Sequence, residues 1–451
     1  MTSTIAPRTD LLPDDVLGAL ARHILVDGYH VVMDLERSHG SYLHDARSGR
    51  DLLDFFTNFA TTPVGYNHPR MGDPEFRERL TAAAITKPAN SDIYTSLYAR
   101  FVETFSRLAI PATHADHLFF IEGGAMAVEN TLKTAFDWKV RKNMLKGLGA
   151  TGGSRVLHFR NAFHGRSGYT LSLTNTADPR KTQYYPVFDW PRLTCPALRF
   201  PVTDAVIADV VRMEETVERE IRAACAEYPN DIAALIIEPI QGEGGDNHFR
   251  PEFFRSLRRL ADEFGFLLIC DEVQTGLGLT GSMWAWQQMG AEPDLFAFGK
   301  KTQVCGFASN HRIDDVDNVF KVSSRINSTW GGNLVDMVRC EQYLEIIEED
   351  RLVENAKVVG AHLLAGLQEM ASEFTGLVSN VRGRGLFIAF DLPDKALRDR
   401  TLAACLDHGL IGLASGASAI RFRPSLALSK AEADEGVEKL RGALTSARSH
   451  A

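Results

Sequence analysis

Residues 266–271 read Phe-Leu-Leu-Ile-Cys-Asp, and residues 295–300 read Leu-Phe-Ala-Phe-Gly-Lys. Each stretch is a short apolar run that is followed by a charged side chain, Asp271 in the first and Lys300 in the second. Short apolar runs of this kind predict buried strands. Active sites of open parallel sheets lie at the carboxyl ends of the strands, so we expect both charged side chains at that edge.

Outward from this pair, apolar runs alternate with helical stretches. Further strands are predicted at His117–Ile121, Arg155–Phe159 and Ile232–Pro239. Helices are predicted from Gly124 to about Leu145 and from Pro251 to about Gly265. Strands that alternate with helices imply right-handed crossovers, so the sequence predicts an α/β fold with a mostly parallel sheet.

The two ends of the chain have a different pattern. A helix is predicted through Pro13–Ile24, and strands around Tyr29–Leu35 and Ser41–Asp45. A long helical stretch runs from 334 to Phe374 with a break near Arg351, and strands follow at Gly385–Asp391 and Ala419–Arg423. The last helix begins at Ser429, where Glu432 completes a capping box. The tail is therefore expected to form an α+β domain.

Composition excludes several classes of protein. The chain of 451 residues carries a net charge of −9, which argues against binding to nucleic acid or to an anionic membrane. Its six cysteines form no CxxC pair, so zinc ribbons are excluded, and no metal site is predicted. Scattered cysteines and the lack of an apolar leader in MTSTIAPRTDLLPDD predict a cytoplasmic protein with reduced thiols.

Asp271 and Lys300 also suit one particular cofactor. Taken singly, each is an ordinary charge at a strand end. Pyridoxal phosphate requires a lysine for its Schiff base and an acid beside its pyridinium nitrogen, and the pair supplies both. It also requires an anion site. Glu-Gly-Gly-Ala at 122–125 follows a predicted strand and opens a helix, where backbone N–H groups favour a phosphate.

Four further side chains are candidates for binding. Phe163, in Phe-His-Gly-Arg at 163–166, could stack on a ring, and Arg166 could bind a carboxylate. Arg421 lies in Ile-Arg-Phe-Arg-Pro, although arginines of such an alternating strand ordinarily point at water. Glu243 lies in Gly-Glu-Gly-Gly at 242–245, where the default interpretation is a solvated loop acid.

Two glycine patterns imitate dinucleotide sites. Gly147, Gly149 and Gly152 precede a predicted strand instead of following one, which is the wrong geometry. The glycines at 276, 278 and 281 follow a strand at a distance, and no acid lies about 20 residues further on. A dehydrogenase that uses NAD is therefore only a remote alternative.

Seven motifs together resemble the class III aminotransferases of fold type I. They are GGA (123–125), FHGR (163–166), EPIQGEGG (238–245), DEVQTG (271–276), FGK (298–300), STWGGN (328–333) and IRFRP (420–424). The resemblance spans about residues 25 to 445. It implies a large cofactor-binding domain with a mostly parallel seven-stranded sheet (76–333). It also implies a smaller α+β domain built from an N-terminal segment (1–75) and a C-terminal one (334–451).

The resemblance also implies roles for individual residues. Lys300 forms the Schiff base with pyridoxal 5'-phosphate and shuttles the proton, and Asp271 pairs with the pyridine nitrogen. Phe163 stacks on the ring, while Gly124 and Ala125 hold the phosphate. The remaining residues that are expected to contact the cofactor are His164, Glu238, Gln274, Ser328 and Thr329. Thr329 matches a residue that reaches the phosphate of a partner subunit, which implies a homodimer with shared active sites.

Within the family, five stretches resemble the bacterial L-lysine 6-aminotransferases more than the ornithine or 4-aminobutyrate aminotransferases. They are KPANSD (87–92), AFHGRSGYTLSLTNT (162–176), QGEGGDNHFRPEFF (241–254), FGKKTQVCG (298–306) and NSTWGGN (327–333). This likeness implies L-lysine and 2-oxoglutarate as substrates. The other two activities stay open as alternatives, because one methylene discriminates by only about 10- to 200-fold. The intact Lys300, Asp271 and Arg166 argue against a catalytically dead relative.

The expected substrates assign the remaining residues. Arg166 would hold the distal carboxylate and Arg421 the one nearer the ring, with Gln274 and Asn327 also touching substrate. Lysine that reacts through its terminal amine has no carboxylate for Arg421. We therefore hypothesise that Glu243 pairs with Arg421 while lysine is bound and swings away for 2-oxoglutarate, in a loop that its glycines allow to hinge.

Overall fold

The computed structural model describes residues 11–449. Residues 1–10, which belong to the stretch where no signal peptide is predicted, and residues 450–451 lie outside the described part. Within residues 11–449, none of the helices combines the length and the apolar character needed to cross a bilayer.

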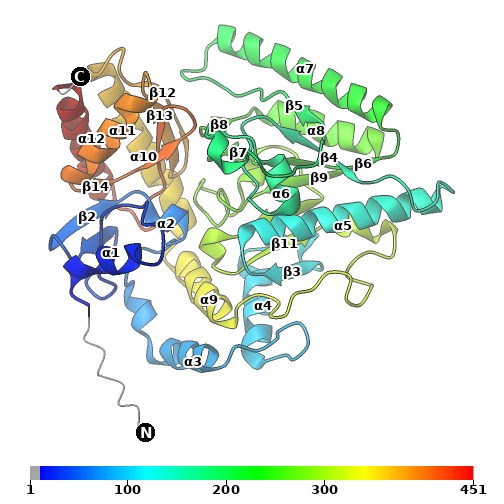
Figure 1. Ribbon diagram of the computed structural model, residues 1–451, viewed down its shortest axis with the longest axis horizontal. Coiled ribbons are helices and arrows are strands. Elements are labelled where there is room, and N and C mark those ends of the chain that lie inside the picture. Colours follow the sequence, from blue (N-terminus) through cyan, green and yellow to red (C-terminus); the bar gives the residue numbers. More distant parts are fainter. Residues whose placement is uncertain (1–10, 450–451) are drawn as a thin grey trace.

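A seven-stranded sheet forms the centre of the larger lobe in the described chain (Figure 1). Its order is β3-β11-β10-β9-β6-β4-β5, and β11 runs antiparallel to both of its neighbours while the other pairs are parallel. The mostly parallel sheet of the prediction is confirmed. The strands are β3 (Leu118–Ile121), β4 (Arg155–Phe159), β5 (Arg192–Leu193), β6 (Ile232–Ile237), β9 (Leu267–Asp271), β10 (Leu295–Phe298) and β11 (Cys305–Ser309).

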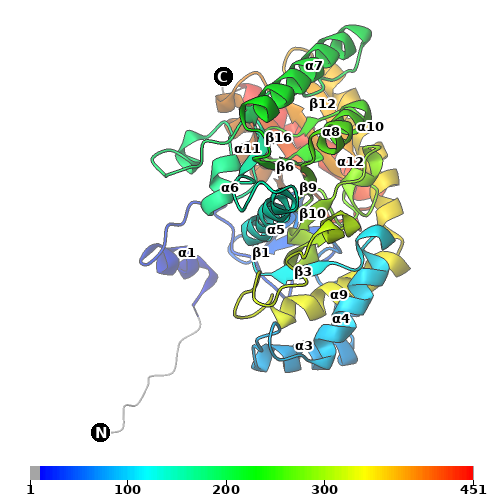
Figure 2. The ribbon, with the colours of Figure 1, turned by 90° about the vertical axis from the view of Figure 1, so that its right-hand side faces the viewer.

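Helices cover both faces of this sheet. Alternate side chains of one strand point to opposite faces. Leu235 and Leu268 belong to the apolar core that includes α8, whereas Ile236 and Ile269 belong to the separate core that includes α5. Figure 2 shows α7 outermost, beyond α8. The helices of this lobe are α3 (Pro74–Ile85), α4 (Ser96–Leu108), α5 (Gly124–Leu145), α6 (Gly168–Leu173), α7 (Asp204–Glu227) and α8 (Pro251–Phe264).

The smaller lobe combines both ends of the described chain, as predicted. Strand β2 (Arg50–Asp54) pairs in parallel with β14 (Leu410–Ile411), so that Leu53 lies opposite Leu410. Strand β1 (Tyr42–Asp45) completes this sheet, and β12 (Ser379–Arg384), β13 (Phe387–Asp391), β16 (Ala419–Phe422) and β15 (Leu413–Ser415) form a second one. The helices are α1 (Pro13–Ala21), α2 (Thr57–Ala60), α10 (Leu352–Glu373), α11 (Lys395–Asp407) and α12 (Lys430–Ser449). The exact domain limits 1–75, 76–333 and 334–451 stay a prediction.

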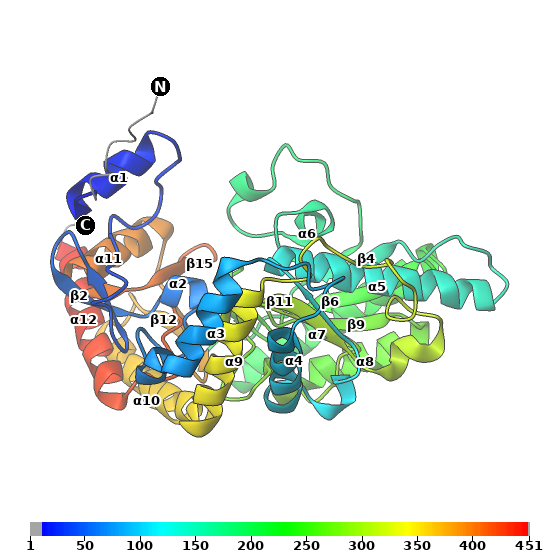
Figure 3. The same cartoon turned by 90° about the horizontal axis from the view of Figure 1, so that it is seen from below.

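Helix α9 (Leu334–Glu349) joins the two lobes and packs against α3 and α4 (Figure 3). The predicted break after it is confirmed, since Arg351 adopts a left-handed conformation between α9 and α10. The capping box of α12 is also confirmed. Ser429 N donates to Glu432 Oε2 at 2.7 Å, and Glu432 N donates to Ser429 Oγ at 3.2 Å.

The strand predicted at Tyr29–Leu35 is wrong. Only Met33 pairs there, through an isolated bridge to Asp45. Tyr29, Val31 and Met33 do pack on the small lobe, which explains the alternating pattern. The segment ends in a turn because Asp34 Oδ1 accepts hydrogen bonds from the backbone N–H groups of residues 36 and 37.

Short elements complete the described chain. Strands β7 (Ile240–Gln241) and β8 (Asn247–His248) form a hairpin beyond β6. The 3₁₀ helices are η1 (Pro69–Gly72), η2 (Ala112–His114), η3 (Pro179–Lys181), η4 (Ala285–Gln288), η5 (Lys300–Thr302) and η6 (His311–Asp315).

Candidate active site

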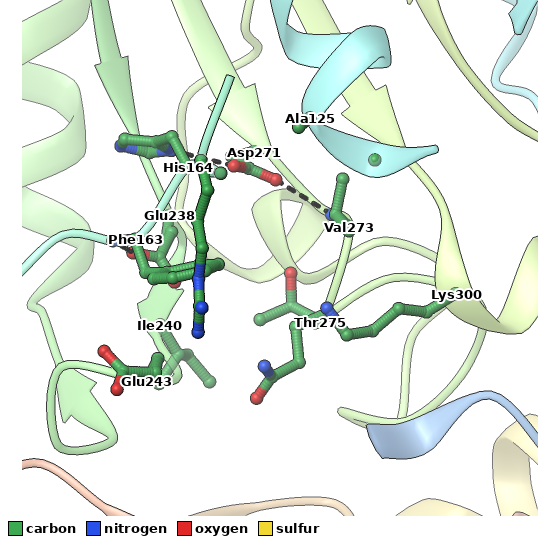
Figure 4. A pocket seen from close by; sticks show the side chains of 14 residues that line it. Ala125, Phe163, His164, Glu238, Ile240, Glu243, Asp271, Val273, Thr275 and Lys300 are labelled. Carbon is green, nitrogen blue, oxygen red and sulfur yellow. Dashed lines mark hydrogen bonds and ion pairs between the residues drawn. The ribbon is translucent and has the colours of Figure 1, made fainter. Parts of the chain in front are cut away.

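The carboxyl ends of the central strands surround one cavity of about 320 Å³ (Figure 4). Strand β9 ends at Asp271, and β10 is followed by Lys300, so the two charged residues of the sequence prediction meet there as expected. The cavity is lined by Gly124, Ala125, Phe163, His164, Gly165, Arg166, Glu238, Ile240, Glu243, Asp271, Val273, Gln274, Thr275 and Lys300.

Asp271 is buried and held from two sides. Its Oδ2 lies 2.7 Å from His164 Nδ1, and its Oδ1 accepts a hydrogen bond from Val273 N at 3.1 Å. Burial alone would lower the pKa of His164, but the hydrogen bond and the negative charge of Asp271 raise it above its usual value. The protonated form of His164 is therefore favoured beside Asp271, and the hydrogen bond fixes the direction of the carboxyl group.

Glu238 fixes the backbone of the loop that carries Phe163. Its Oε1 accepts from Phe163 N at 2.9 Å and its Oε2 from Gly242 N at 3.0 Å. Burial, reinforced by the charge of Asp271, raises the pKa of Glu238 to about 7, although His164 acts in the opposite direction. This carboxyl group joins two loops at the cavity wall.

Lys300 reaches the cavity from an unusual backbone conformation. Its φ is +55°, in the left-handed region that L-residues seldom adopt. Glycine precedes it because a Cβ at Gly299 would lie 2.9 Å from Cys305 Sγ. Burial lowers the pKa of Lys300, and Arg421 lowers it further. The amine is therefore more easily neutral, which is what a nucleophile or proton acceptor requires.

The start of α5 supplies an anion site. The helix begins at Gly124 without a side-chain cap, so its first backbone N–H groups face the cavity. Gly165 packs against this turn, since a Cβ there would lie 2.6 Å from the Cβ of Ala125. The loop 163–166 and the helix start are thus held in direct contact.

The two predicted arginines differ in burial. Arg166 lines the cavity with an exposed side chain, and its guanidinium lies 5.9 Å from the centre of the Phe163 ring. Arg421 is only 4% exposed, although alternation along its strand suggested that it would face water. Both faces of β16 are covered, which explains the difference. Arg421 Nη1 donates to Gln274 Oε1 at 3.3 Å, and its Nε has no partner among the described residues.

Arg423 and Asp246 form a buried ion pair that the sequence did not reveal. Both oxygens of Asp246 accept from Arg423 Nη2, at 2.8 and 2.7 Å, and the side chains are at most 1% exposed. Arg423 also donates to Gln274 Oε1 from Nε and Nη2, each at 3.2 Å. Gln274, which was expected to contact cofactor and substrate, thus lines the cavity while two arginines donate to its side-chain oxygen. The second arginine of Ile-Arg-Phe-Arg was the only sequence signal.

Among the described residues Glu243 contacts Lys181, and its expected pairing with Arg421 while lysine is bound stays a prediction. Its Oε1 binds Lys181 Nζ, and Arg421 is bound elsewhere. Two of the glycines around it, Gly242 and Gly244, are explained by close packing. A Cβ at Gly242 would lie 2.3 Å from Gln274 Oε1, and one at Gly244 would lie 1.7 Å from Asn161 O, so both positions need glycine for close contact. Any movement of Glu243 has to come from its side chain.

Asn327, Ser328 and Thr329 do not line the cavity of their own chain. Ser328 Oγ accepts from Gly331 N at 3.0 Å, and Thr329 is exposed. This loop is attached to the segment after α3, where Ser91 Oγ donates to Ser328 O at 3.0 Å. Their predicted contacts with cofactor and substrate would require a second copy of the chain.

The second dinucleotide-like pattern has a structural explanation. A Cβ at Gly276 would lie 2.4 Å from Trp284 Cζ3, and Gly278 and Gly281 both have a positive φ in a turn. The turn leads to η4 and not to a helix that could receive a pyrophosphate. These glycines serve close packing.

The residues present fit pyridoxal phosphate. The Asp271 carboxyl group, the Lys300 amine, the ring of Phe163 and the uncapped start of α5 supply the four contacts that the cofactor needs. A Cβ at Gly124 would lie 2.9 Å from Val273 Cγ1, so this turn of α5 packs tightly against the residues that follow Asp271.

Comparisons with known proteins agree with this chemistry. The L-lysine-epsilon aminotransferase of Mycobacterium tuberculosis is 53% identical over 435 residues, which is 96% of each chain. The enzyme of the same name from Amycolatopsis lactamdurans is 49% identical and covers 98% of each chain. A solved structure of the lysine aminotransferase from M. tuberculosis in the internal aldimine form superimposes with a TM-score of 0.94. It shares 51% identity and covers 97% of this chain and 100% of that one.

The family model "Aminotransferase class-III" matches residues 25–444, nearly the whole chain. Enzymes of this class use pyridoxal phosphate, for which the cavity is suited. The fold, the site and the three comparisons lead to one assignment: this chain belongs to the class III aminotransferases.

Proposed function

We propose that the protein is an L-lysine 6-aminotransferase. It would transfer the ε-amino group of L-lysine to 2-oxoglutarate and release L-glutamate and 2-aminoadipate 6-semialdehyde, which cyclises to a piperideine carboxylate. Relatives of 49–53% identity that carry this name support the lysine assignment. The observation that carries the proposal is the arrangement of Lys300 with an exposed arginine, Arg166, and a buried one, Arg421.

Pyridoxal phosphate, when bound, supplies an electron sink that makes the C–H bond beside the reacting amine acidic. The Asp271 carboxyl group, which the hydrogen bond with His164 orients, would hold a proton on the ring nitrogen. Lys300, which burial favours as the neutral amine, takes the proton from the amine-bearing carbon and returns it later. Glu238 and Gly124 position the groups around them and take no part in the proton transfer.

The arginines explain how two unlike substrates share one cavity. Lysine reacts at its ε-end, so its carboxylate lies far from Lys300, where the exposed Arg166 can bind it. 2-Oxoglutarate has carboxylates at both ends. Arg421 would bind the one beside the reacting carbon, and Arg166 the distal one. The buried Nε of Arg421 is open to such a ligand, since no described residue binds it.

We also propose a homodimer with shared active sites. The exposed Thr329 follows Ser328 in a loop that contacts the segment 87–94. Exposed apolar side chains gather in these two segments, namely Ile93 (68%), Tyr94 (75%) and Trp330 (43%). A surface of this kind is typical of a protein interface. Light scattering should give twice the chain mass, and a Thr329→Arg variant should lose phosphate affinity at the site.

Initial rates with 2-oxoglutarate and each of L-lysine, L-ornithine and 4-aminobutyrate test the substrate assignment. L-Lysine should have the highest kcat/KM. A higher value for ornithine or 4-aminobutyrate would leave the fold and the chemistry of Lys300 in place but would overturn the assignment.

A further inference from the structure

An ion pair at the edge of the cavity joins Glu243 to Lys181, a residue that no motif indicated. Lys181 Nζ contacts Glu243 Oε1, and the two side chains are only 19% and 21% exposed. Water and salt weaken a pair at this depth less than one on the open surface. The pair therefore has a defined effect on where the Glu243 carboxylate lies.

A short turn directs Lys181 toward the cavity. Lys181 ends η3, in which Asp178 Oδ1 accepts from Arg180 N at 3.2 Å. The neighbouring Arg180 points away, with a side chain that is 79% exposed and bound to the same aspartate at 2.8 Å. One turn thus presents two adjacent cations to different surroundings, the cavity edge and the solvent.

Glu243 has a second cation within electrostatic reach. Burial lowers the pKa of Arg421, and the charges of Asp246 and Glu243 oppose that effect. Glu243 Oε2 is buried and has no hydrogen-bond partner among residues 11–449, and the same holds for Arg421 Nε. Figure 4 shows the Glu243 carboxylate directed away from the side of the cavity where Lys300 lies. Lys181 and Arg421 are therefore competing partners for one carboxylate.

We propose that Lys181 is a positioning residue that holds Glu243 away from Arg421 and so keeps Arg421 open for the carboxylate of a dicarboxylic substrate. The inference rests on the proposed function in that it assigns the dicarboxylate to 2-oxoglutarate. The backbone of residue 243 is fixed, because Gly416 N donates to Glu243 O at 3.0 Å and Ser415 Oγ donates to Gly242 O at 2.7 Å. The choice between the two cations is made by side-chain rotation alone.

Loss of the Lys181 charge should shift this choice. Without it, Glu243 is drawn to Arg421 and competes with the incoming carboxylate. The apparent dissociation constant of a ligand that binds only one of two states equals the intrinsic constant divided by the fraction of that state, so it rises as the other state becomes more populated. Lysine, which presents no carboxylate to Arg421, should not be weakened in this way.

The test uses holoenzyme and a Lys181→Met variant, which keeps the chain length and removes the charge. Calorimetry would measure binding of glutarate, an unreactive five-carbon dicarboxylate, and stopped-flow absorbance would follow the half-reactions with lysine and with 2-oxoglutarate. The dissociation constants of glutarate and 2-oxoglutarate should rise about tenfold, a usual size for coupling between two sites. That of lysine should stay the same or fall.

Three further variants distinguish a positioning role of Lys181 from a general structural effect of its loss. Arg180→Met removes the adjacent exposed cation and should change neither ligand, and Lys181→Arg should restore glutarate binding. In a Glu243→Gln background, Lys181→Met should have no further effect, because the competing charge is already gone. Unchanged glutarate binding in Lys181→Met, or equal weakening of glutarate and lysine, would overturn the inference. A wild-type enzyme that rejects lysine would refute the proposed function, while glutarate binding would still decide the role of Lys181.

Discussion

His164 Nδ1 lies 2.7 Å from Asp271 Oδ2, and the two side chains are buried together at the carboxyl end of β9. The imidazole directs the carboxyl group, and an acid that faces a ring nitrogen needs a fixed direction. An amide at position 271 would keep the shape and lose the charge.

Asp271→Asn should therefore lower kcat by about 10²- to 10⁴-fold, the range in which proton-transfer groups contribute. Thermal melting of the variant should stay close to that of the wild type, because the amide oxygen can still accept from His164. Glu272→Gln is the matched control, since the neighbouring carboxyl group points away, toward Thr275 and the backbone of residue 286. A kcat for Asp271→Asn within about twofold of the control would contradict the assigned role.

Gly165→Ala should weaken binding of pyridoxal phosphate. The new Cβ would lie 2.6 Å from that of Ala125, so the loop 163–166 has to move away from the start of α5. Gly149→Ala is the control, because Gly149 also has a positive φ but nothing lies within 4 Å of its Cβ position. Titration of apoenzyme with the cofactor should show a dissociation constant at least about tenfold higher for the first variant only. Equal affinities would show that the contact does not shape the site.

Arg421→Met and Arg166→Met should affect the two half-reactions differently. Loss of a buried charged partner costs a ligand carboxylate about 2–5 kcal/mol, so Arg421→Met should raise the KM for 2-oxoglutarate by about 30-fold or more. Its effect on the lysine half-reaction should be much smaller. Arg166→Met should weaken both substrates. Pre-steady-state absorbance measures each half separately, and a uniform loss in Arg421→Met would be inconsistent with two carboxylate sites.

Stability should depend on pH through Glu272. Burial raises the pKa of this carboxyl group to about 7, against an ordinary value of 4.5. The folded protein thus keeps a proton that the unfolded chain releases, so this contribution to stability is present below about pH 4.5 and is lost as the pH rises through about 7. Between pH 6 and pH 8 the wild type should lose about 1 kcal/mol more than Glu272→Gln.

Urea unfolding at the two pH values measures this difference. The exposed Glu354 provides a control, since Glu354→Gln should follow the wild type. Parallel curves for the wild type and Glu272→Gln would mean that Glu272 is ionised in the folded protein at both pH values.

The sequence predicted the strands that carry Asp271 and Lys300 because both are apolar throughout and end at a charge. It did not predict β11, which reads Cys-Gly-Phe-Ala-Ser and consists mainly of small residues. Glycine is required at 306 because a Cβ there would lie 2.0 Å from Phe119 O. Such close contact between strands leaves no apolar pattern to read.

Partners within the site were harder to predict than its members. Glu243 was recognised as a site residue, but its contact with Lys181 joins two segments that lie 62 residues apart in the sequence. Arg423 and Asp246 are likewise partners from distant parts of the sequence, 177 residues apart. Local pattern identifies charged residues at strand ends, whereas ion pairs between distant segments depend on the tertiary arrangement.

The central claim is that Lys300 and its surroundings accept the terminal amine of lysine and return it to a keto acid. An absorbance scan of holoenzyme with L-lysine, L-ornithine or 4-aminobutyrate, without any keto acid, tests it most directly. We predict that L-lysine converts the visible band of the bound cofactor to the amine form fastest and that 2-oxoglutarate restores the band. An unchanged band with L-lysine, or a band that 2-oxoglutarate fails to restore, would contradict the claim.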